Sequence, residues 1–526
     1  DGREVYLNGK KIDDVTTHPA YKNAVYAASS LYDFQSDPKH IEYMTFESPT
    51  SGNRVNRCWQ LTKNYDELVQ RRKAISGWAR LSGGWLGRSP DHIASSMVGQ
   101  IMGLPIFEKH SPERAKAIWE YFKWVRDNDS YMTYVIINPQ ANRDKGTGEQ
   151  QDEFLATGVV DENAEGITVR GGKMLGTGSI MANEVLFANI QPLKPGEEKY
   201  AISFAIPMNT KGLKIMSRRS YEESASSLYD YPLSARYDEN DALIYCDDVK
   251  VPWERVFIYR DTDTARAQFQ DTYAHYMQNY QAQIRLMVKM QFQLGVARRI
   301  CETIGTIEIP SVIEKLGHMA AQAAMVEGLV YGMESGGGNY NGYYVPDRNL
   351  MYTAQVLTQQ LYPEFITSMR ELAGGGLIML PSSAEDFANP ELNKYINATQ
   401  KSAIGSSEEK VKFMKLAWDS IGSEFASRHT QYEMFYAGAQ FVTRGHSFRT
   451  YNWERSAELL DSVLDTYSLK DGIKDGFLTP FKVKRIQTTM DEYVYTGDDD
   501  ILSGEEEVNE GEVFEEKDFN KRIVIE

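Results

Sequence analysis

Apolar residues at helical spacing dominate the first third of the chain, and the clearest run starts at Ser111. A serine is a good helix cap, and Pro112 after it suits the first helical position. The apolar face that follows consists of Ile118, Phe122 and Val125. The pattern stops near residues 127–129, so we predict a helix that ends there, within a mostly helical N-terminal domain of residues 1–130.

From residue 131 onward, apolar and polar positions alternate, which is typical of half-buried strands. Turn residues such as those of 161–166 separate the runs. The predicted strands are residues 134–137, 157–160, 167–170 and 200–205. We therefore predict a central β domain over residues 131–262.

Helical spacing returns after residue 262 in four long segments with short connections. They are residues 268–304, 311–334, 348–373 and 406–427. Ser406 and Glu409 have capping-box spacing at the start of the last segment, and the glycine-rich residues 336–342 are predicted to be a loop. Four such helices indicate an up-and-down bundle over residues 263–480. The predicted fold class is α+β.

Residues 481–526 form an acidic tail. Between Asp491 and Asp518 lie thirteen acidic residues and one lysine, which account for most of the net charge of −17. This composition predicts a solvated or partner-covered arm. The rest of the chain is mildly acidic and has no basic patch, so nucleic-acid binding is not expected.

The three cysteines lie far apart, at Cys58, Cys246 and Cys301. Their spacing fits neither a disulfide framework nor a Cys-x-x-Cys metal site, so we predict no metal and a reducing cytoplasm. No run of about eighteen apolar residues and no basic-then-apolar leader occurs, so we predict neither a membrane span nor a signal peptide. Asp1 is not an initiator residue, and we expect the natural chain to begin further upstream.

Three blocks of sequence, each built around an arginine, carry the strongest functional signal. They are Leu86-Gly87-Arg88-Ser89-Pro90-Asp91-His92, Asn138-Pro139-Gln140-Ala141-Asn142-Arg143 and Asp247-Asp248-Val249-Lys250-Val251-Pro252-Trp253-Glu254-Arg255-Val256-Phe257. In this order and at this spacing, they resemble the oxygenase component of two-component aromatic hydroxylases, the 4-hydroxyphenylacetate 3-hydroxylase family. The resemblance covers residues 1 to about 455.

This resemblance implies an acyl-CoA dehydrogenase-like fold, with an N-terminal helical domain, a central β-barrel or sandwich and a C-terminal four-helix bundle. It also implies hydroxylation of a phenol, ortho or para to its hydroxyl, through a flavin C4a-hydroperoxide. FADH2 and molecular oxygen would be cosubstrates, and a separate NAD(P)H:flavin reductase would supply the FADH2. The chain has no Rossmann or P-loop fingerprint, which agrees with an outside source of electrons. A homodimer or homotetramer is implied as well.

The glycine-rich segment 171–179 would by itself indicate an ordinary hairpin. In the resembled family, this segment and the block after residue 137 line the flavin ring. The residues implied as flavin contacts are Pro139, Gln140, Asn142, Arg143, Thr177 and Ser179, with Thr177 nearest the reactive N5 edge.

Two further features are candidates for the flavin phosphates. Gly374 and Gly375 lie in a glycine turn that resembles the pyrophosphate contact of this fold, often made across a subunit boundary, although alone it is typical of a helix C-cap. Arg285 and Lys289 are one helical turn apart, so they could both meet one phosphate or form a solvated face.

The substrate side is expected at Arg88, His92 and Tyr134, with Arg444, His446 and Phe448 as a second wall. In the family, the arginine of the first block binds the phenolic oxygen, an aromatic or imidazole group four residues later assists, and a histidine often occupies the strand position of Tyr134. Here, the histidine and the tyrosine have exchanged places. The late block 435–451 resembles the branch that acts on simple, chloro- or nitrophenols, which favours a phenol without a carboxylate side chain.

The chemistry explains why these residue types are needed. The pKa of a phenol, near 10, must fall by about three units for ionisation at neutral pH, which requires about 4 kcal/mol of preferential stabilisation. An exposed ion pair gives at most about 1 kcal/mol, so a partly buried arginine with a second donor or a base is required. Arg88 would stabilise the oxyanion, His92 would accept or relay the proton, and Tyr134 would complete the hydrogen bonds.

There are three alternatives to this interpretation. An acyl-CoA dehydrogenase-like desaturase would use a bundle glutamate, Glu371 or Glu334, as its base. An iron–sulfur flavin dehydratase related to the family would need several cysteines around the site, and three scattered ones do not suffice. A non-enzymatic protein would only bind flavin, or a partner through its acidic tail.

Overall fold

The computed structural model describes residues 1–139, 141–464, 474–476, 493–494 and 513–514. They fall into two units, Asp1–Tyr451 and Asn452–Glu526. The second unit contains α17 (Trp453–Leu464) and the antiparallel strands β15 (Tyr493–Val494) and β16 (Val513–Phe514). Apart from these two strands, the predicted acidic tail lies outside the described residues.

A six-stranded sheet in the first unit has the order β2-β1-β10-β11-β7-β6. Its strands are β1 (Glu4–Leu7), β2 (Lys10–Ile12), β6 (Gly158–Glu162), β7 (Gly166–Lys173), β10 (Leu213–Ser217) and β11 (Ala242–Pro252). Neighbouring strands pair antiparallel, except β1 and β10, which are parallel.

A four-stranded sheet has the order β12-β9-β8-β5, with β5 parallel to β8. Its strands are β5 (Met132–Val135), β8 (Glu184–Phe187), β9 (Ile202–Pro207) and β12 (Val256–Tyr259). Apolar side chains of both sheets, such as Val169 and Phe204, belong to one buried cluster. The two sheets therefore pack face to face, as alternating apolar strands require.

The first twelve residues join the β layer, which differs from the mostly helical pattern predicted for residues 1–130. Asn8 and Gly9 have φ of 51° and 75° and form the two-residue turn between β1 and β2. Asn-Gly favours such a turn because both positions need positive φ. A second hairpin in this region pairs β3 (Thr45–Glu47) with β4 (Arg54–Asn56).

The N-terminal helices are α1 (Lys22–Ser36), α2 (Ile41–Met44), α3 (Tyr65–Leu81), α4 (Pro90–Met102), α5 (Pro105–His110) and α6 (Pro112–Asp127). The helix predicted from Ser111 is confirmed as α6, because the Ser111 hydroxyl accepts a hydrogen bond from the backbone N–H of Arg114. Two short helices, α7 (Tyr221–Ser224) and α8 (Ser234–Tyr237), lie between β10 and β11. The 3-10 helices are η1 (Arg57–Trp59), η2 (Thr147–Glu149), η3 (Glu198–Tyr200), η4 (Trp253–Arg255), η5 (Gly374–Leu377) and η6 (Ala384–Phe387).

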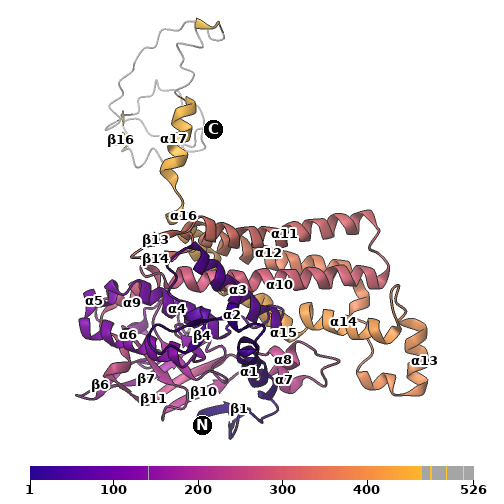
Figure 1. The fold of residues 1–526 in the computed structure, drawn as a ribbon, viewed down its shortest axis with the longest axis horizontal. Coiled ribbons are helices and arrows are strands. Elements are labelled where there is room, and N and C mark those ends of the chain that lie inside the picture. Colours follow the sequence, from indigo (N-terminus) through magenta and orange to yellow (C-terminus); the bar gives the residue numbers. More distant parts are fainter. Residues whose placement is uncertain (140, 465–473, 477–492, 495–512, 515–526) are drawn as a thin grey trace. The chain divides into compact units, whose positions relative to one another are not determined.

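The later helices are α9 (Thr262–Gln270), α10 (Ala274–Ile304), α11 (Pro310–Ser335), α12 (Arg348–Ala373), α13 (Pro390–Thr399), α14 (Ser407–Ile421), α15 (Glu424–Phe435) and α16 (Gln440–Thr450). The long helices α10, α11 and α12 lie side by side in Figure 1 and pack against one another. The predicted segment 406–427 is two helices, because α14 ends at Gly422 and the hydroxyl of Ser423 caps α15. Among the described helices, none combines the length and the apolar character that crossing a bilayer requires.

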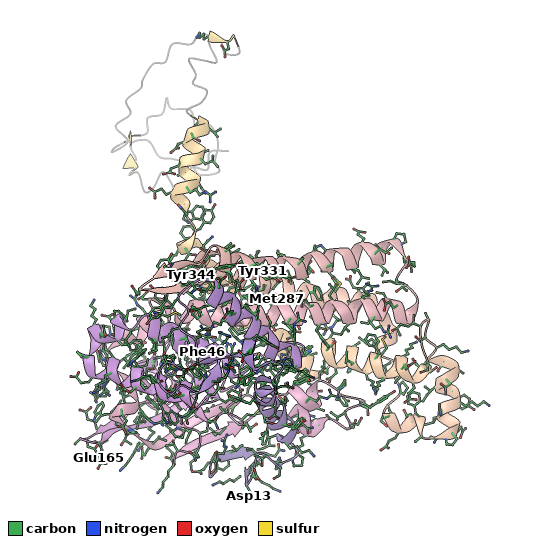
Figure 2. The ribbon with its side chains drawn as sticks, in the orientation of Figure 1. Asp13, Phe46, Glu165, Met287, Tyr331 and Tyr344 are labelled. Carbon is green, nitrogen blue, oxygen red and sulfur yellow. The ribbon has the colours of Figure 1, made fainter. Side chains whose placement is uncertain are left out.

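The predicted loop at residues 336–342 contains a hairpin of β13 (Gly338–Tyr340) and β14 (Tyr343–Val345). Asn341 and Gly342 form its turn, with φ of 51° and 77°. Figure 2 shows Tyr344 and Tyr331 on the helical side of the first unit, whereas Asp13 and Glu165 lie on the side of the strands.

The helices α4 and α10 approach each other at backbone distance. A Cβ atom at Gly99 would lie 2.3 Å from backbone atoms of Tyr273 and Ala274, so only glycine fits there. The amide of Tyr273 also donates to the Gly99 carbonyl, at 3.1 Å. This contact fixes α4, which carries His92, against the start of α10.

Candidate active site

Arg88 lies in the short loop before α4, and three contacts hold that loop. Its backbone N–H donates to the Glu239 carboxylate, and the Tyr131 hydroxyl donates to its carbonyl at 2.9 Å. A Cβ at Gly87 would lie 2.9 Å from the Tyr432 ring, so the loop and α15 are in close contact. The Ser89-Pro90 step then starts α4. The loop therefore fixes the direction in which the Arg88 side chain leaves the backbone.

The guanidinium of Arg88 contacts helix α15. It donates from NH1 to the Tyr432 hydroxyl at 2.7 Å and from NH2 to the Tyr436 carbonyl at 3.4 Å. It also lies 5.8 Å from the centre of the Tyr134 ring and 4.9 Å from that of Tyr432. Burial disfavours its charge, but Tyr134, Tyr432 and Glu239 outweigh burial and raise the pKa of Arg88, so it stays cationic. Within the described part of the chain, no carboxylate forms a salt bridge with this guanidinium.

His92 is buried and lies between two glutamines of α10. Gln281 donates its amide N–H to Asp91 at 3.0 Å, which turns its oxygen toward His92 Nδ1 at 2.8 Å. The amide nitrogen of Gln278 lies 2.9 Å from His92 Nε2. These partners assign the proton to Nδ1 and leave Nε2 as an acceptor. Burial, together with the charge of Arg88, holds the pKa of His92 well below its usual range, so the ring is neutral.

Tyr134 completes the cluster from strand β5. Its ring lies 5.7 Å from that of His92, and the side chain is partly buried. A loop, a helix and a strand therefore bring Arg88, His92 and Tyr134 together, as the sequence predicts. A fixed cation, a neutral imidazole and a phenol suit the binding and deprotonation of an acidic hydroxyl group.

The glycine-rich segment predicted to contact flavin lies directly beside the Arg88 loop. A Cβ at Gly178 would be 3.7 Å from the Arg88 carbonyl and 2.6 Å from the Tyr131 hydroxyl. The Thr177 carbonyl accepts from the Thr133 hydroxyl, and the Thr177 hydroxyl donates to Asp241, both at 2.6 Å. The structure thus places the two predicted sites next to each other.

One feature of this segment fits a bound polar ring. The Ser179 hydroxyl is fully buried and has no hydrogen-bond partner among the described residues, and a ligand atom could satisfy it. A Cβ at Gly172 would lie 3.2 Å from the Leu155 carbonyl oxygen and 3.3 Å from the ring of Pro139, so this glycine lets the strand pack closely against both residues. Asn142 and Arg143 are on an exposed loop, and Gln140 lies outside the described residues.

Lys173, which the sequence analysis did not select, is a buried residue of this same segment. Its ammonium donates to the Asn138 side chain at 2.7 Å, and burial lowers its pKa to about 7. The strand also contains Thr168 and Arg170, so the sequence gives no sign that this lysine is buried.

The prediction for Arg285 and Lys289 needs correction. Arg285 pairs with Glu433 at 2.6 Å and Lys289 pairs with the same carboxylate at 3.0 Å, and the two basic side chains are 1% and 0% exposed. They are not a solvated face. Both cations are paired with Glu433 within the core, so neither is available to bind a flavin phosphate.

The prediction of a second wall on α16 is also corrected. Arg444 is exposed and bonds to Gln440, and Phe448 is 63% exposed. His446 is buried but stacks on Tyr352, with ring centres 4.9 Å apart. The wall that contacts Arg88 belongs instead to α15.

Gly374 and Gly375 lie at the end of α12, in the turn η5. Gly374 has φ of 59° at the helix C-cap, and a Cβ at either glycine would meet nothing within 4 Å. The turn is therefore open, and a contact with cofactor or with another subunit remains a prediction.

The two glutamates proposed as the base of a desaturase form ion pairs away from the Arg88 cluster. Glu334 is buried and pairs with Arg72 at 2.6 Å, and it also accepts from the Tyr280 hydroxyl. Glu371 is 55% exposed and pairs with Lys315. Neither contacts the Arg88 cluster, which weakens that alternative.

The sequence analysis missed the residues that surround Arg88 and His92. Gln278 and Gln281 belong to a run of polar residues in α10. That run could have identified them as site residues, because buried amides need hydrogen-bond partners. Tyr432, Tyr436 and Glu239 carry no comparable local signal, since they reach Arg88 only through the fold.

Comparisons with known proteins agree with this geometry. The chain matches "4-hydroxyphenylacetate 3-hydroxylase N terminal" over residues 1–258 and "4-hydroxyphenylacetate 3-hydroxylase C terminal" over residues 265–465. It is 35% identical over 459 residues to the 4-hydroxyphenylacetate 3-monooxygenase oxygenase component of Pseudomonas aeruginosa, which covers 85% of this chain and 86% of the relative. It is 34% identical to the oxygenase component of a Rhodococcus 4-nitrophenol 2-monooxygenase, which covers 86% of both.

Solved structures are similar as well. The crystal structure of a 4-hydroxyphenylacetate 3-monooxygenase oxygenase component complexed with FAD and 4-hydroxyphenylacetate has a TM-score of 0.83 and 32% identity, and covers 88% of this chain and 96% of that one. An archaeal 4-hydroxybutyryl-CoA dehydratase from N. maritimus has a TM-score of 0.81, and covers 89% of this chain and 93% of that one. At 21% identity, it shows a shared fold alone.

Proposed function

Because the chain belongs to the 4-hydroxyphenylacetate 3-hydroxylase family, we propose that it is the oxygenase component of a two-component monooxygenase that hydroxylates a phenol. The reaction is phenol + O2 + FADH2 → hydroxylated phenol + H2O + FAD. The observation that carries the proposal is the partly buried Arg88 guanidinium, which has no carboxylate counter-ion among the described residues and lies beside His92 and Tyr134. A phenolate would supply the missing negative charge.

Arg88 binds the phenolic oxygen in this proposal. The Tyr432 hydroxyl and the Tyr436 carbonyl each accept one hydrogen bond from a terminal nitrogen of Arg88. The remaining N–H groups of the guanidinium can donate to an oxyanion. About 4 kcal/mol is needed to ionise a phenol at neutral pH, and a charge-assisted hydrogen bond in a partly buried site gives more than an exposed pair. The cation is already oriented before the substrate arrives.

His92 accepts or relays the phenol proton at Nε2, the nitrogen that now faces Gln278. Asp91 and Gln281 hold the opposite nitrogen in its protonated form. Tyr134 completes the hydrogen bonds around the phenolic oxygen. A neutral imidazole suits this role because a cationic one could accept no proton.

The residues that would hold flavin are Pro139, Gln140, Asn142, Arg143, Thr177 and Ser179, with Gly374 and Gly375 at its pyrophosphate. The buried Ser179 hydroxyl, which has no partner among the described residues, supports this assignment. When bound, reduced flavin supplies two electrons and activates dioxygen, which delivers an electrophilic oxygen atom. Because Thr177 lies next to the Arg88 loop, a flavin in contact with Thr177 would have its N5 edge close to the phenol.

The substrate is proposed to be a phenol without a carboxylate side chain, hydroxylated ortho or para to its hydroxyl group. The late block 435–451 supports this choice, as does the relative named for 4-nitrophenol, a phenol without a carboxylate. The FADH2 comes from a separate NAD(P)H:flavin reductase, as the naming of the relatives as oxygenase components suggests.

The finer architecture is proposed to be acyl-CoA dehydrogenase-like, with an N-terminal helical domain, a β-barrel or sandwich and a C-terminal four-helix bundle. The order of helices, two facing sheets and long antiparallel helices supports it. A homodimer or homotetramer is supported by apolar side chains on the outer face of α11, where Ile313 is 52% and Met325 37% exposed. Three unpaired, buried cysteines support a reducing cytoplasm.

The decisive experiment supplies the purified chain with photoreduced FAD, 18O2 and a phenol, without any reductase. We expect one 18O atom in the hydroxylated product. Hydrogen peroxide alone, with no labelled product from phenol, 4-nitrophenol or 4-hydroxyphenylacetate, would contradict the proposal and favour a flavin-binding role. Bleaching of added FAD by an acyl-CoA would favour the desaturase instead.

A further inference from the structure

The geometry points to Arg428 as a positioning residue that links the Arg88 loop to Thr177. It thereby fixes the position of the phenol relative to the flavin, which we call their register. This inference rests on the proposed function. Arg428 lies on α15, and only 12% of its side chain is exposed. Among the described residues, it makes no hydrogen bond to the Arg88 guanidinium or to residues 177–179, and it acts through two carboxylates.

All three guanidinium nitrogens of Arg428 are engaged. NH1 donates to Glu239 at 3.0 Å. Nε and NH2 donate to the two oxygens of Asp241 at 3.0 and 2.6 Å. This forked geometry fixes the positions of both carboxylates relative to one side chain, because the guanidinium is planar and rigid.

Each carboxylate also accepts a hydrogen bond from one of the two segments. The other oxygen of Glu239 accepts the backbone N–H of Arg88. Asp241 accepts the Thr177 hydroxyl at 2.6 Å, and the Glu239 carbonyl accepts the backbone N–H of Gly178 at 3.0 Å. Arg428 therefore lies at the middle of a continuous chain of hydrogen bonds that runs from the phenol-binding loop to the flavin-binding segment.

The charges in this network are nearly balanced and mostly buried. Arg218 also pairs with Asp241, at 2.9 Å, and with Asp238, at 2.5 Å. Despite burial, the two arginines hold the pKa of Asp241 well below its usual range, and the acids raise that of Arg428. A network whose members are all ionised and bonded has one preferred arrangement, and loss of one member leaves the others unpaired.

Helix α15 also holds the other end of Arg88. Arg428 and Tyr432 on α15 and Tyr436, its C-cap residue, are spaced by four residues and follow one side of that helix. Tyr432 and Tyr436 contact the Arg88 guanidinium, while Arg428 reaches the Arg88 backbone through Glu239. Side chains from one side of α15 therefore fix both the backbone position of Arg88 and the direction of its guanidinium.

The expected consequence concerns the fate of the oxygen. With both reactants in register, FADH2, O2 and phenol give the hydroxylated phenol, FAD and water. When the phenol is displaced from the flavin, FADH2 + O2 → FAD + H2O2 proceeds alone. A misplacement of about 1 Å can reduce a reaction by about 100-fold, so this partition is a sensitive measure of register.

The test uses Arg428→Lys, which keeps the charge but cannot span both carboxylates. We expect the ratio of hydroxylated product to hydrogen peroxide to fall by about tenfold or more. The dissociation constants for FAD and for the phenol, each measured separately at equilibrium, should stay within about threefold of the original protein. The change in the absorption spectrum of bound FAD on addition of phenol should diminish as well, and this readout requires no turnover.

The matched control is Arg219→Lys. Arg219 joins the same β10–β11 connection to α15 through Glu424, but at the surface, where both side chains are 65% exposed. Its variant should keep the original product ratio and the phenol-induced spectral change.

A second variant covers the case in which Arg428→Lys does not fold. Glu239→Gln keeps an acceptor for the Arg88 N–H but turns an amide N–H toward Arg428, and it should lower the product ratio in the same way. Unaltered product ratio and spectral change in the folded variants would overturn the positioning role while leaving the proposed function intact. Absence of hydroxylated product from the original protein would remove both.

Discussion

The Tyr432 hydroxyl accepts a hydrogen bond from the Arg88 guanidinium at 2.7 Å, so a phenol of the protein already lies against the cation proposed to bind a substrate phenol. The two residues are 344 positions apart in the chain. The Tyr432 ring also lies 5.3 Å from the guanidiniums of Arg285 and Arg428. This tyrosine therefore separates and orients three cations around the candidate site.

Tyr432→Phe should lower kcat/KM for the phenol by about 10- to 100-fold, because a hydrogen bond to a charged group contributes about 1.5–3 kcal/mol. FAD binding should be unaffected. Steady-state kinetics with photoreduced FAD measure the effect, and Tyr229→Phe, which removes a surface hydroxyl bonded to the Glu408 carbonyl, is the control. Equal kcat/KM in both variants would show that Tyr432 does not orient Arg88.

Arg88→Ala should preserve folding and FAD binding but convert nearly all FADH2 oxidation into hydrogen peroxide. The phenol then loses the cation that supplies most of the roughly 4 kcal/mol needed for its ionisation, so hydroxylation should fall about 1,000-fold. Product analysis together with a peroxide assay checks this expectation. An undiminished yield of hydroxylated phenol would remove Arg88 from the mechanism.

Local signals in the sequence explain which parts of the fold were predictable. Helix α6 follows from the Ser111 cap, and α12 begins and ends at the predicted residues, because caps and apolar spacing act within a few residues. The break between α14 and α15 was missed, since apolar spacing continues across Gly422. The hairpin at Asn8-Gly9 was missed although its turn residues are typical of one.

The candidate site was predictable only in part, for the same reason. Arg88 and His92 belong to one local block, and Tyr134 was identified by resemblance. The spacing of Arg285 and Lys289 correctly implies a shared helix face, but spacing does not reveal that Glu433, 148 and 144 residues later, lies against it. Contacts between distant segments depend on packing, which a pattern of neighbours does not record.

Asp91→Asn should remove a pH dependence of stability. Burial raises the pKa of Asp91 to about 6 from 3.8, so between these values the folded protein holds a proton that the unfolded chain has released. The stability of the original protein should therefore fall by about 2 kcal/mol as the pH rises from 4 to 6. Asparagine can still accept from Gln281, so the variant should match the original protein near pH 4 and exceed it by about this amount at pH 7.

Urea unfolding at both pH values measures the difference. Asp13→Asn, at an exposed position on the side of the strands, is the control and should change the stability by at most about 0.5 kcal/mol. A constant difference for Asp91→Asn would mean that Asp91 ionises normally in the folded state.

Glu433→Gln should destabilise the fold by about 3–5 kcal/mol, because it leaves Arg285 and Lys289 buried without their counter-ion. Despite burial, the two cations lower the pKa of Glu433 to about 2, so its contribution is complete above pH 4.5 and is lost as the pH falls toward 2. Denaturant unfolding at pH 7 tests the magnitude. Glu424→Gln on the same helix, 65% exposed, should cost at most about 1 kcal/mol.

The backbone contact at Gly99 makes the candidate site depend on one glycine. Since a single added carbon there would collide with backbone atoms of Tyr273 and Ala274, any other residue at this position would push α4 and α10 apart. His92 on α4 would then move away from Gln278 and Gln281 on α10, and the imidazole would lose the hydrogen bonds that fix its proton.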